Sequence, residues 1–285
     1  MDIWTIRRVL EWTASDLSKR GVASARLDAE VLLAHALGTD RLGLFLDIDR
    51  PLDPDERAVY RRLVETRRQR VPVAHITGER EFWSLPIVVD PHVLVPRPDT
   101  EVVVEEALAV VPAGSPQVAV DVGTGSGCIA LAVASERPDL RVLALDIDRR
   151  AALVAAGNAK ALGLDSRVAV AVGDLLAPVA GPVGLVVANL PYIPSGRIDG
   201  LEPEVSRWEP RLALDGGQDG LAVFRRLVPQ AADVVVPGGW LVLEVADAEQ
   251  ARQVEALLTP AFALVRVRRD YGHEARAVVA RRVVP

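Results

Sequence analysis

The feature that most constrains the fold is the alternation of short apolar runs with helix-like stretches over the second half of the chain. Short runs rich in Val, Leu and Ala that alternate with helices predict βαβ units, whose strands are buried on both faces of a parallel sheet. The predicted parallel strands are Gln117–Val122, Arg141–Leu145, Val168–Val172, Val183–Ala188 and Trp240–Val245. A terminal antiparallel pair is predicted at Ala263–Arg268 and Ala275–Ala280. These patterns indicate an α/β domain.

Residues 1–72 predict a small all-helical domain. Ser24 can cap a helix that ends before Gly38. Asp53 is a predicted N-cap, with Pro54 at the first helical position and Glu56 completing a capping box. Apolar residues fall at helical spacing in the two helices before that box, at Ile6, Leu10, Leu17, Leu27, Val31, Leu32 and Ala36.

Residues 73–97 have a different amino-acid pattern from the segments on either side. Apolar and aromatic residues are interrupted there by Pro86 and Pro91, a pattern typical of a β-hairpin linker. The chain therefore divides into a helical domain (1–72), a linker (73–97) and an α/β domain (98–285).

Composition excludes several classes of protein. Half of the 285 residues are hydrophobic, which is enough for a large core, but no apolar run is long enough to cross a bilayer. The single cysteine, Cys128, excludes an internal disulfide, and it is expected to be a buried small hydrophobe. The net charge of -6 argues against a protein that binds nucleic acid through phosphates. A cluster of arginines is interpreted as the solvated face of a helix: Arg57, Arg61, Arg62, Arg67, Arg68 and Arg70. The scattered histidines predict no metal site.

A glycine-rich turn follows the first predicted strand of the α/β domain. Gly123, Gly125 and Gly127 allow the backbone to approach a ligand closely, and the helix that follows offers oriented N–H groups. A dinucleotide-binding turn would have its third glycine at position 128, which is Cys128 here. This spacing, preceded by Asp121, disfavours an NAD-dependent oxidoreductase and suits S-adenosylmethionine, which has no pyrophosphate.

Acidic residues end the next two strands. Asp146 is placed to accept both ribose hydroxyls of a nucleoside, and Asp174 to approach the adenine, with Leu175 packing on its ring. The expected cofactor-binding residues are Asp121, Gly123, Thr124, Gly125, Ser126, Gly127, Asp146, Asp174, Leu175 and Asn189.

The fourth strand ends in Asn189-Leu190-Pro191-Tyr192, at the sheet edge where open α/β folds bind ligands. Asn189 Oδ1 and the Leu190 carbonyl can each accept one N–H of a planar NH₂ group, which directs the nitrogen lone pair towards a methyl donor. Pro191 fixes the turn and Tyr192 can stack on the planar group. These four residues are the predicted catalytic residues.

Longer sequence segments indicate a family more specifically than the four-residue motif does. The segments Pro72–Glu105 and Glu209–Leu221, together with VDVGTGSGCIALA, resemble the release factor glutamine methyltransferase family over nearly the whole chain. The resemblance implies a helical N-terminal domain that grips the substrate, a hairpin linker and a seven-stranded, Rossmann-like class I methyltransferase domain. It also implies transfer of a methyl group from S-adenosyl-L-methionine to N5 of the glutamine in the Gly-Gly-Gln motif of bacterial-type peptide chain release factors.

The chain departs from the family pattern at particular positions. Leu190 replaces the usual Pro, Asp99 the usual Glu, and the segments around Glu244 and Tyr271 differ. Because of Leu190, a second hypothesis for the function remains, an adenine N6-methyltransferase acting on RNA or DNA. A third hypothesis is a catalytically silent S-adenosylmethionine-binding protein. We expect a cytoplasmic monomer without a membrane or direct nucleic-acid partner.

Overall fold

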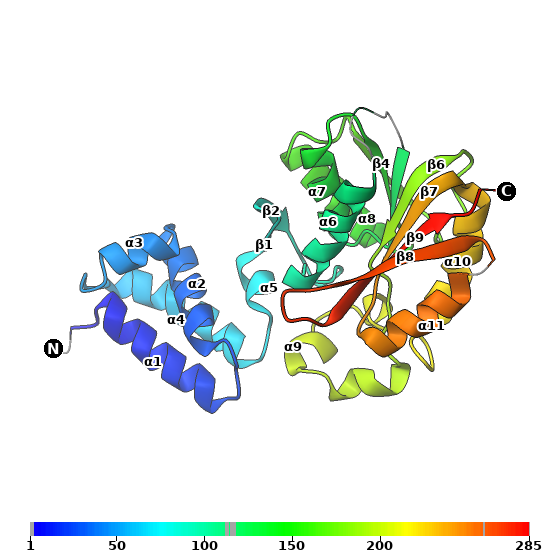
Figure 1. The fold of residues 1–285 in the computed structure, drawn as a ribbon. Helices are drawn as coiled ribbons and strands as arrows, with labels where there is room; N and C mark the ends of the chain where they lie inside the picture. The colour runs from blue at the N-terminus through cyan, green and yellow to red at the C-terminus, as the bar shows by residue number, and fades with distance from the viewer. Residues whose placement is uncertain (1–2, 112–113, 115–117, 259, 285) are drawn as a thin grey trace. The chain divides into compact units, whose positions relative to one another are not determined.

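A computed structural model describes residues 3–111, 114, 118–258 and 260–284 (Figure 1). The chain forms two compact units. The first comprises the residues up to Gly78 together with Glu202–Trp208, and the second comprises Glu79–Leu201 together with the chain from Glu209 onwards. Among the described residues, no helix combines the length and apolarity that crossing a membrane requires.

The first unit is helical, as predicted. Its helices are α1 (Ile6–Lys19), α2 (Ala25–Leu37), α3 (Arg41–Leu46), α4 (Pro54–Arg68), α5 (Val73–Thr77) and α9 (Pro203–Ser206). The core is built from the apolar faces of α1, α2 and α4, and Leu10, Leu32 and Leu33 are fully buried in it. This burial supplies the main stabilisation, because helices this short are marginal in isolation.

The caps of these helices test the predictions made from the sequence. The capping box at Asp53 and Glu56 is confirmed, and Gly38 ends α2 in the left-handed conformation. Ser24 occupies the N-cap position of α2, but the prediction that it caps the helix is wrong. Its hydroxyl donates to Asp28 Oδ1 (2.8 Å) and makes no hydrogen bond to the backbone of α2.

The linker differs from the expected one at its start. Residues Val73–Thr77 are helical (α5), and the first unit extends to Gly78. The antiparallel hairpin is confined to β1 (Glu79–Phe82) and β2 (Leu85–Val88), and it belongs to the second unit. The unit boundary thus lies at a glycine with φ of 83°, which ends α5.

The second unit contains a seven-stranded sheet in the order β5-β4-β3-β6-β7-β9-β8. Strands β3 to β7 are parallel, and β9 pairs antiparallel with both β7 and β8. The bounds are β3 Val118–Val122, β4 Arg141–Asp146, β5 Val168–Val172, β6 Val183–Ala188, β7 Val235–Glu244, β8 Phe262–Arg269 and β9 Ala275–Arg282. The predicted parallel sheet with a terminal antiparallel pair is confirmed; Gln117 lies outside the described residues.

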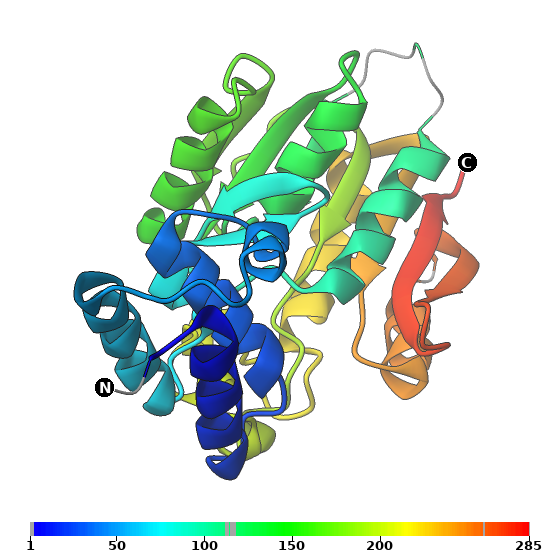
Figure 2. The ribbon, with the colours of Figure 1, turned by 90° about the vertical axis from the view of Figure 1, so that its left-hand side faces the viewer.

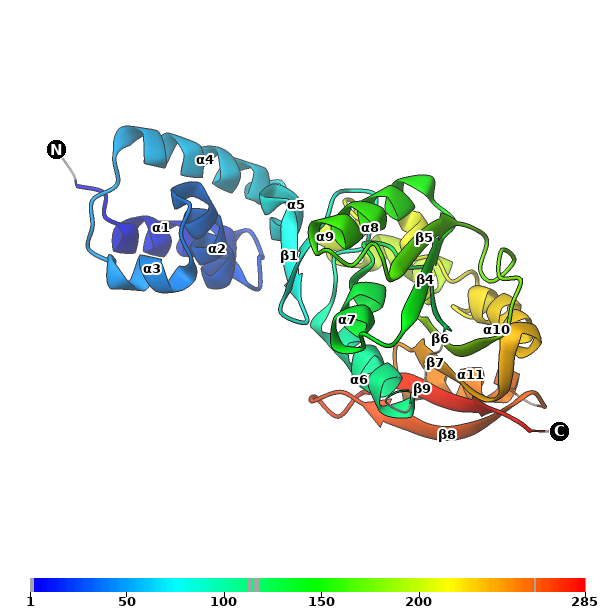
Figure 3. The ribbon, with the colours of Figure 1, turned by 90° about the horizontal axis from the view of Figure 1, so that it is seen from above.

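Helices cover both faces of this sheet. Helices α6 (Glu101–Val110), α7 (Cys128–Glu136) and α8 (Arg149–Ala161) lie on one face, and α10 (Ala222–Val234) and α11 (Ala248–Leu258) lie on the other (Figures 2 and 3). Strand β6 is buried at every residue, as continuous apolarity predicted. Short 3₁₀ helices η1 (Pro98–Thr100), η2 (Ser195–Gly200) and η3 (Arg211–Ala213) lie in the connections.

Asn158 on α8 joins the hairpin to the glycine-rich turn. Its side chain pairs with the backbone of Val88, accepting at Oδ1 (3.0 Å) and donating from Nδ2 (2.9 Å). Nδ2 also donates to the carbonyl of Ser126 (2.8 Å). Asn158 is almost completely buried, so these bonds form where water cannot replace them.

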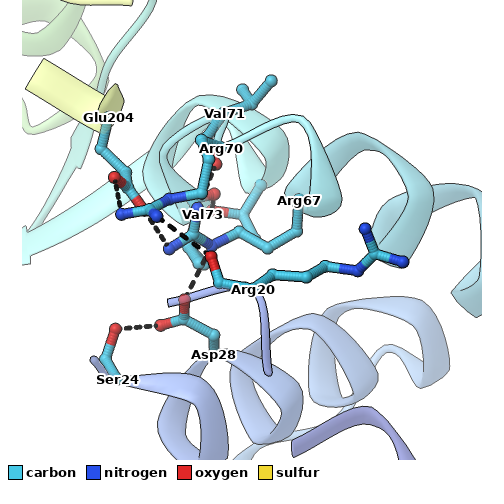
Figure 4. A network of polar contacts seen from close by, with 9 residues as sticks. Arg20, Ser24, Asp28, Arg67, Arg70, Val71, Val73 and Glu204 are labelled. Carbon is cyan, nitrogen blue, oxygen red and sulfur yellow. Dashed lines mark hydrogen bonds and ion pairs between the residues drawn. The ribbon is translucent and has the colours of Figure 1, made fainter. Parts of the chain in front are cut away.

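The arginine cluster is not uniformly a solvated face. Arg67 is buried, and its guanidinium donates to Asp28 Oδ2 (2.7 Å) and Glu204 Oε1 (2.6 Å), while Arg70 donates to both oxygens of Glu204 (2.6 Å each) (Figure 4). The solvated-face interpretation is therefore wrong for Arg67, although Arg61 and Arg62 are exposed.

The position of Arg67 along α4 explains this difference. Arg67 follows Tyr60 and Val64 at helical spacing, so it lies on the apolar face of α4. Its charge is satisfied there by Glu204, a residue far away in sequence that follows the fourth strand of the parallel sheet. A short segment between η2 and η3 is in this way held in the helical unit by ion pairs.

We predict that Glu204→Gln loosens this segment. Breaking charged hydrogen bonds to a buried arginine should lower the free energy of local opening by about 2 kcal/mol. Hydrogen exchange of the amides of Glu204, Val205 and Ser206 should then accelerate by about 30-fold, measured by mass spectrometry. Glu65→Gln, at an exposed position on α4, is the matched control. Equal exchange in the two variants would contradict a structural role for the Glu204 ion pairs.

Candidate functional site

A cavity opens in the second unit at the carboxyl ends of β3, β4, β5 and β6. In an open α/β sheet this edge binds ligands. Most of the predicted site residues line the cavity, namely Gly123, Thr124, Gly125, Ser126, Asp146, Asp174, Leu175, Asn189, Leu190 and Pro191. Three predicted residues, Asp121, Gly127 and Tyr192, lie beside the cavity and not in its wall.

The glycine-rich turn needs glycine for different reasons at its two ends. Gly123 has φ of 71° and is exposed at the cavity, where a Cβ would point towards the Asn189 carbonyl oxygen at 3.7 Å. Gly127 has φ of 85°, and a Cβ there would lie 3.2 Å from Ala155 and Leu131. Gly123 thus keeps the backbone accessible to a ligand, whereas Gly127 allows α7 to pack closely on α8.

Asp121 stabilises the glycine-rich turn through hydrogen bonds. Its Oδ2 accepts hydrogen bonds from the Thr124 hydroxyl (2.6 Å) and the Ala130 amide (3.1 Å). Complete burial raises the pKa of this carboxyl to about 6, although both donors oppose the rise. The described contacts of Asp121 therefore fix the strand-to-helix turn.

Asp146 ends β4 at the cavity. Its two oxygens accept from the amides of Gly125 (Oδ2, 2.9 Å) and Asp148 (Oδ1, 2.9 Å), and burial raises its pKa. Each carboxylate oxygen has a second lone pair, so hydroxyl groups of a ligand can still be accepted. The same side chain thereby shapes the glycine-rich turn and faces the cavity.

Leu175 lines the cavity in a conformation that leucine rarely adopts, with φ of 52°. The neighbouring Asp174 is half-exposed and accepts from Arg226 Nη2 (2.5 Å). Strained backbone at a cavity wall is typical of ligand sites, and an apolar side chain held there suits a flat aromatic ring.

The Asn189–Tyr192 motif follows β6 directly. Asn189 Nδ2 donates to the Thr100 hydroxyl (3.2 Å), and Tyr192 donates to Glu244 Oε1 (3.3 Å). Leu190 is buried. The chain after the motif pairs with the loop that follows η3, because Ile193 N donates to Leu214 O (3.0 Å) and Gly216 N donates to Ile193 O (2.9 Å).

Several functional candidates were missed in the sequence. Thr100 and Arg97 line the cavity from the segment before α6. Arg97 donates to Glu209 (2.6 Å), whose other oxygen accepts from Val95 N (3.3 Å). Glu209 is therefore buried behind the cavity and does not line it. No periodic pattern in the sequence identifies this partner of Arg97.

Cys128 is half-buried, so the prediction of a fully buried residue is wrong, but its thiol is not activated. It contributes to the cavity wall, and burial raises its pKa to about 12, so the nucleophilic thiolate does not form at neutral pH. Among the residues that the structure describes, no cluster of His, Cys, Asp and Glu side chains has the arrangement of a metal site.

The sheet order and the cavity define the class of protein, an S-adenosylmethionine-dependent class I methyltransferase. The chemistry of the cavity wall is compatible with this cofactor, because it combines the carboxylate oxygens of Asp146, the apolar side chain of Leu175 and the accessible backbone of Gly123.

Comparisons with known proteins agree. The family model for the PrmC N-terminal domain matches residues 8–78, and the family model for the methyltransferase small domain matches residues 104–199. A protein named release factor glutamine methyltransferase from Geobacter sulfurreducens is 46% identical, covering 85% of this chain and 84% of the relative. One of the same name from Bradyrhizobium diazoefficiens is 42% identical, covering 99% and 96%. The chain belongs to the release factor glutamine methyltransferase family.

A solved methyltransferase structure from Pyrococcus furiosus is similar in fold. It is 18% identical with a TM-score of 0.53, over 70% of this chain and 90% of that one. The resemblance in sequence and the expected seven-stranded α/β fold are thus confirmed.

We predict that Asp146→Ala weakens cofactor binding before it affects any other step. Loss of charged hydrogen bonds to a ribose should raise the Kd for S-adenosylmethionine by about 10- to 100-fold, measured by calorimetry. Asp165→Ala, at an exposed position after α8, is the control and should bind normally. An unchanged titration of the Asp146 variant would remove this residue from the cofactor site.

Proposed function

We propose that this enzyme methylates N5 of the glutamine in the Gly-Gly-Gln motif of bacterial-type peptide chain release factors. Membership of the release factor glutamine methyltransferase family supports this substrate. The proposal assigns cofactor binding to the glycine-rich turn, Asp146 and Leu175. It assigns the substrate amide to Asn189, Leu190, Pro191 and Tyr192.

The observation that carries the proposal is the orientation of the Asn189 side chain. Its Nδ2 is engaged by Thr100, so Oδ1 is the end of the carboxamide left to accept a hydrogen bond. A second acceptor in the proposal is the carbonyl oxygen of Leu190. Two acceptors at the end of β6 match the two N–H groups of a primary amide, and they do not depend on the Pro that the family usually has at position 190.

These residues would act by orientation and electrostatics. Bound S-adenosylmethionine supplies an electrophilic methyl group on a positively charged sulfur. Asn189 and Leu190 hold both N–H groups of the glutamine amide, which directs the nitrogen lone pair towards that methyl group. A carbon–nitrogen bond forms as the carbon–sulfur bond breaks, and one amide proton leaves to solvent. The acceptors favour the reaction because they stabilise the positive charge that develops on the nitrogen.

We also propose that the enzyme acts as a cytoplasmic monomer and that the helical unit contacts the body of the release factor. The net charge of -6 disfavours RNA or DNA as the substrate, since a surface that neutralises phosphates is usually basic. Adenine is the alternative acceptor, because its exocyclic amino group also presents two N–H groups in a plane.

A labelling experiment tests the substrate. The purified protein would receive methyl-labelled S-adenosylmethionine with a bacterial-type release factor and, separately, with total RNA and with DNA. We expect label on the release factor alone, mapped by mass spectrometry to the Gly-Gly-Gln glutamine. Label on nucleic acid alone would overturn the proposal in favour of the adenine alternative. An absence of label in the presence of bound cofactor would indicate a silent binding protein.

We predict that Asn189→Ala separates binding from turnover. Turnover should fall by about 100- to 1,000-fold, because an acceptor needed mainly in the transition state is lost. The Kd for S-adenosylmethionine should stay within about threefold, since the ribose and adenine contacts of the proposal remain. Single-turnover kinetics and calorimetry provide the two measurements. A comparable loss of cofactor affinity would place Asn189 in the cofactor site instead.

A further inference from the structure

Two arginines contribute to the wall of the cavity, from opposite ends of the strands that border it. Arg226 on α10 pairs with Asp174, which follows β5, at one end of the row β5-β4-β3-β6. Arg97 precedes η1 at the other end, where its carbonyl accepts from the amide of Thr100 (3.1 Å), the residue that contacts Asn189 after β6. Positive charge is therefore present at both ends of the cavity.

Arg97 is held on one side by a buried carboxyl group. Its Nη2 donates to Glu209 Oε2 (2.6 Å), and Glu209 Oε1 accepts from the Val95 amide (3.3 Å). The side chain of Glu209 is 1% exposed, whereas that of Arg97 is 39% exposed. Within the described part of the chain, this is the only hydrogen bond of the Arg97 guanidinium, and a guanidinium carries several further N–H donors. The remaining donors are available to a ligand in the cavity.

The other charges on the cavity wall are mostly negative. Acidic side chains line it at Asp146, Asp148, Asp174 and Asp215. Moving an anionic group of a ligand from water into such a place is costly unless a cation compensates its charge. Arg226 already pairs with Asp174, at the end of the cavity where the adenine is proposed to bind. Arg97 is therefore the arginine that can receive an anionic group of the ligand.

The proposed placement of S-adenosylmethionine leaves one anionic group to be accommodated. Its adenine is assigned to Leu175 after β5, its ribose to Asp146 after β4, and its reactive methyl group to the neighbourhood of Asn189 after β6. The methionine part ends in a carboxylate and an ammonium group, and it is left for the side of the cavity away from β5. Arg97 lies on that side, next to the segment that contacts Asn189.

We propose that Arg97 binds the carboxylate of the methionine part of S-adenosylmethionine, while Glu209 holds the guanidinium in place. The planar fork of N–H groups on arginine matches the two oxygens of a carboxylate. This inference rests on the proposed cofactor site and adds the group that recognises the amino-acid end of the cofactor. Arg97 transfers no proton. It contributes affinity for the cofactor and selects against ligands that lack the carboxylate.

The test compares S-adenosylmethionine with decarboxylated S-adenosylmethionine, which differs from it only in lacking that carboxylate. Calorimetry gives the Kd of each ligand. The parent protein should bind the decarboxylated ligand about 10- to 100-fold more weakly, because a charged, two-pronged hydrogen bond is lost. Equal affinities of the two ligands for the parent protein would overturn the proposal, whatever the variants do.

Arg97→Gln should remove most of this discrimination. The Kd for S-adenosylmethionine should rise by about 10- to 50-fold, whereas the Kd for the decarboxylated ligand should change by less than about threefold. If Arg97 were only the structural partner of Glu209, its replacement would leave the ratio of the two Kd values unchanged, and that result would overturn the proposal. If Arg97→Gln does not fold, Arg97→Lys takes its place, and it should weaken S-adenosylmethionine alone, by about three- to tenfold.

Arg226→Gln is the matched control, because it removes the other arginine of the cavity wall. It acts at the end where the adenine is proposed to bind, so it should change both Kd values by a common factor and keep their ratio. A changed ratio in this variant would assign the carboxylate to the other end of the cavity and overturn the proposal. The measurement needs no methyl acceptor. If the parent protein failed to methylate a release factor, the ratio of the Kd values would still decide on Arg97, so the two failures are distinguishable.

Discussion

The hydrogen bonds of the Asn158 carboxamide are the interaction on which much of the second unit depends. One buried side chain satisfies the backbone of the hairpin at Val88 and of the glycine-rich turn at Ser126. The turn is then held from two sides, because Asp121 fixes Thr124 and the first turn of α7. The cofactor site that we propose at this turn consists mostly of backbone, and it needs such support because glycine residues by themselves leave the loop many conformations.

Residues distant in the sequence also hold the segment that follows the Asn189–Tyr192 motif. Part of the chain returns to pair with the motif, through the hydrogen bonds of Ile193 with Leu214 and Gly216. Another part, around Glu204, is held in the helical unit by Arg67 and Arg70. The connection between β6 and α10 therefore includes residues that support the proposed catalytic motif and residues that belong to the helical unit.

Patterns of short range proved reliable as predictors. The bounds of β5 and β6 follow from their apolar runs, and the capping box at Asp53 follows from residues within one turn of helix. Other local predictions failed because neighbouring side chains and the surrounding structure decided the outcome. Ser24 donates to Asp28, which also holds Arg67, and Val73–Thr77 forms a helix although the texture of its sequence suggested a hairpin. For the proposed site, most residues that line the cavity were predicted from the sequence. The hydrogen bonds that hold these residues in place were not predicted.

The sequence by itself determined the class of fold, the edge of the sheet at which the cavity lies and the order of the residues along that edge. It could do so because strand periodicity, glycine at positive φ and the polar ends of strands are local properties. Only the tertiary structure decided that Asp121 supports the turn, that Arg67 is buried and that Thr100 meets Asn189. Each of these depends on which donor and acceptor become neighbours when water is excluded, and residues far apart in the chain make that choice together.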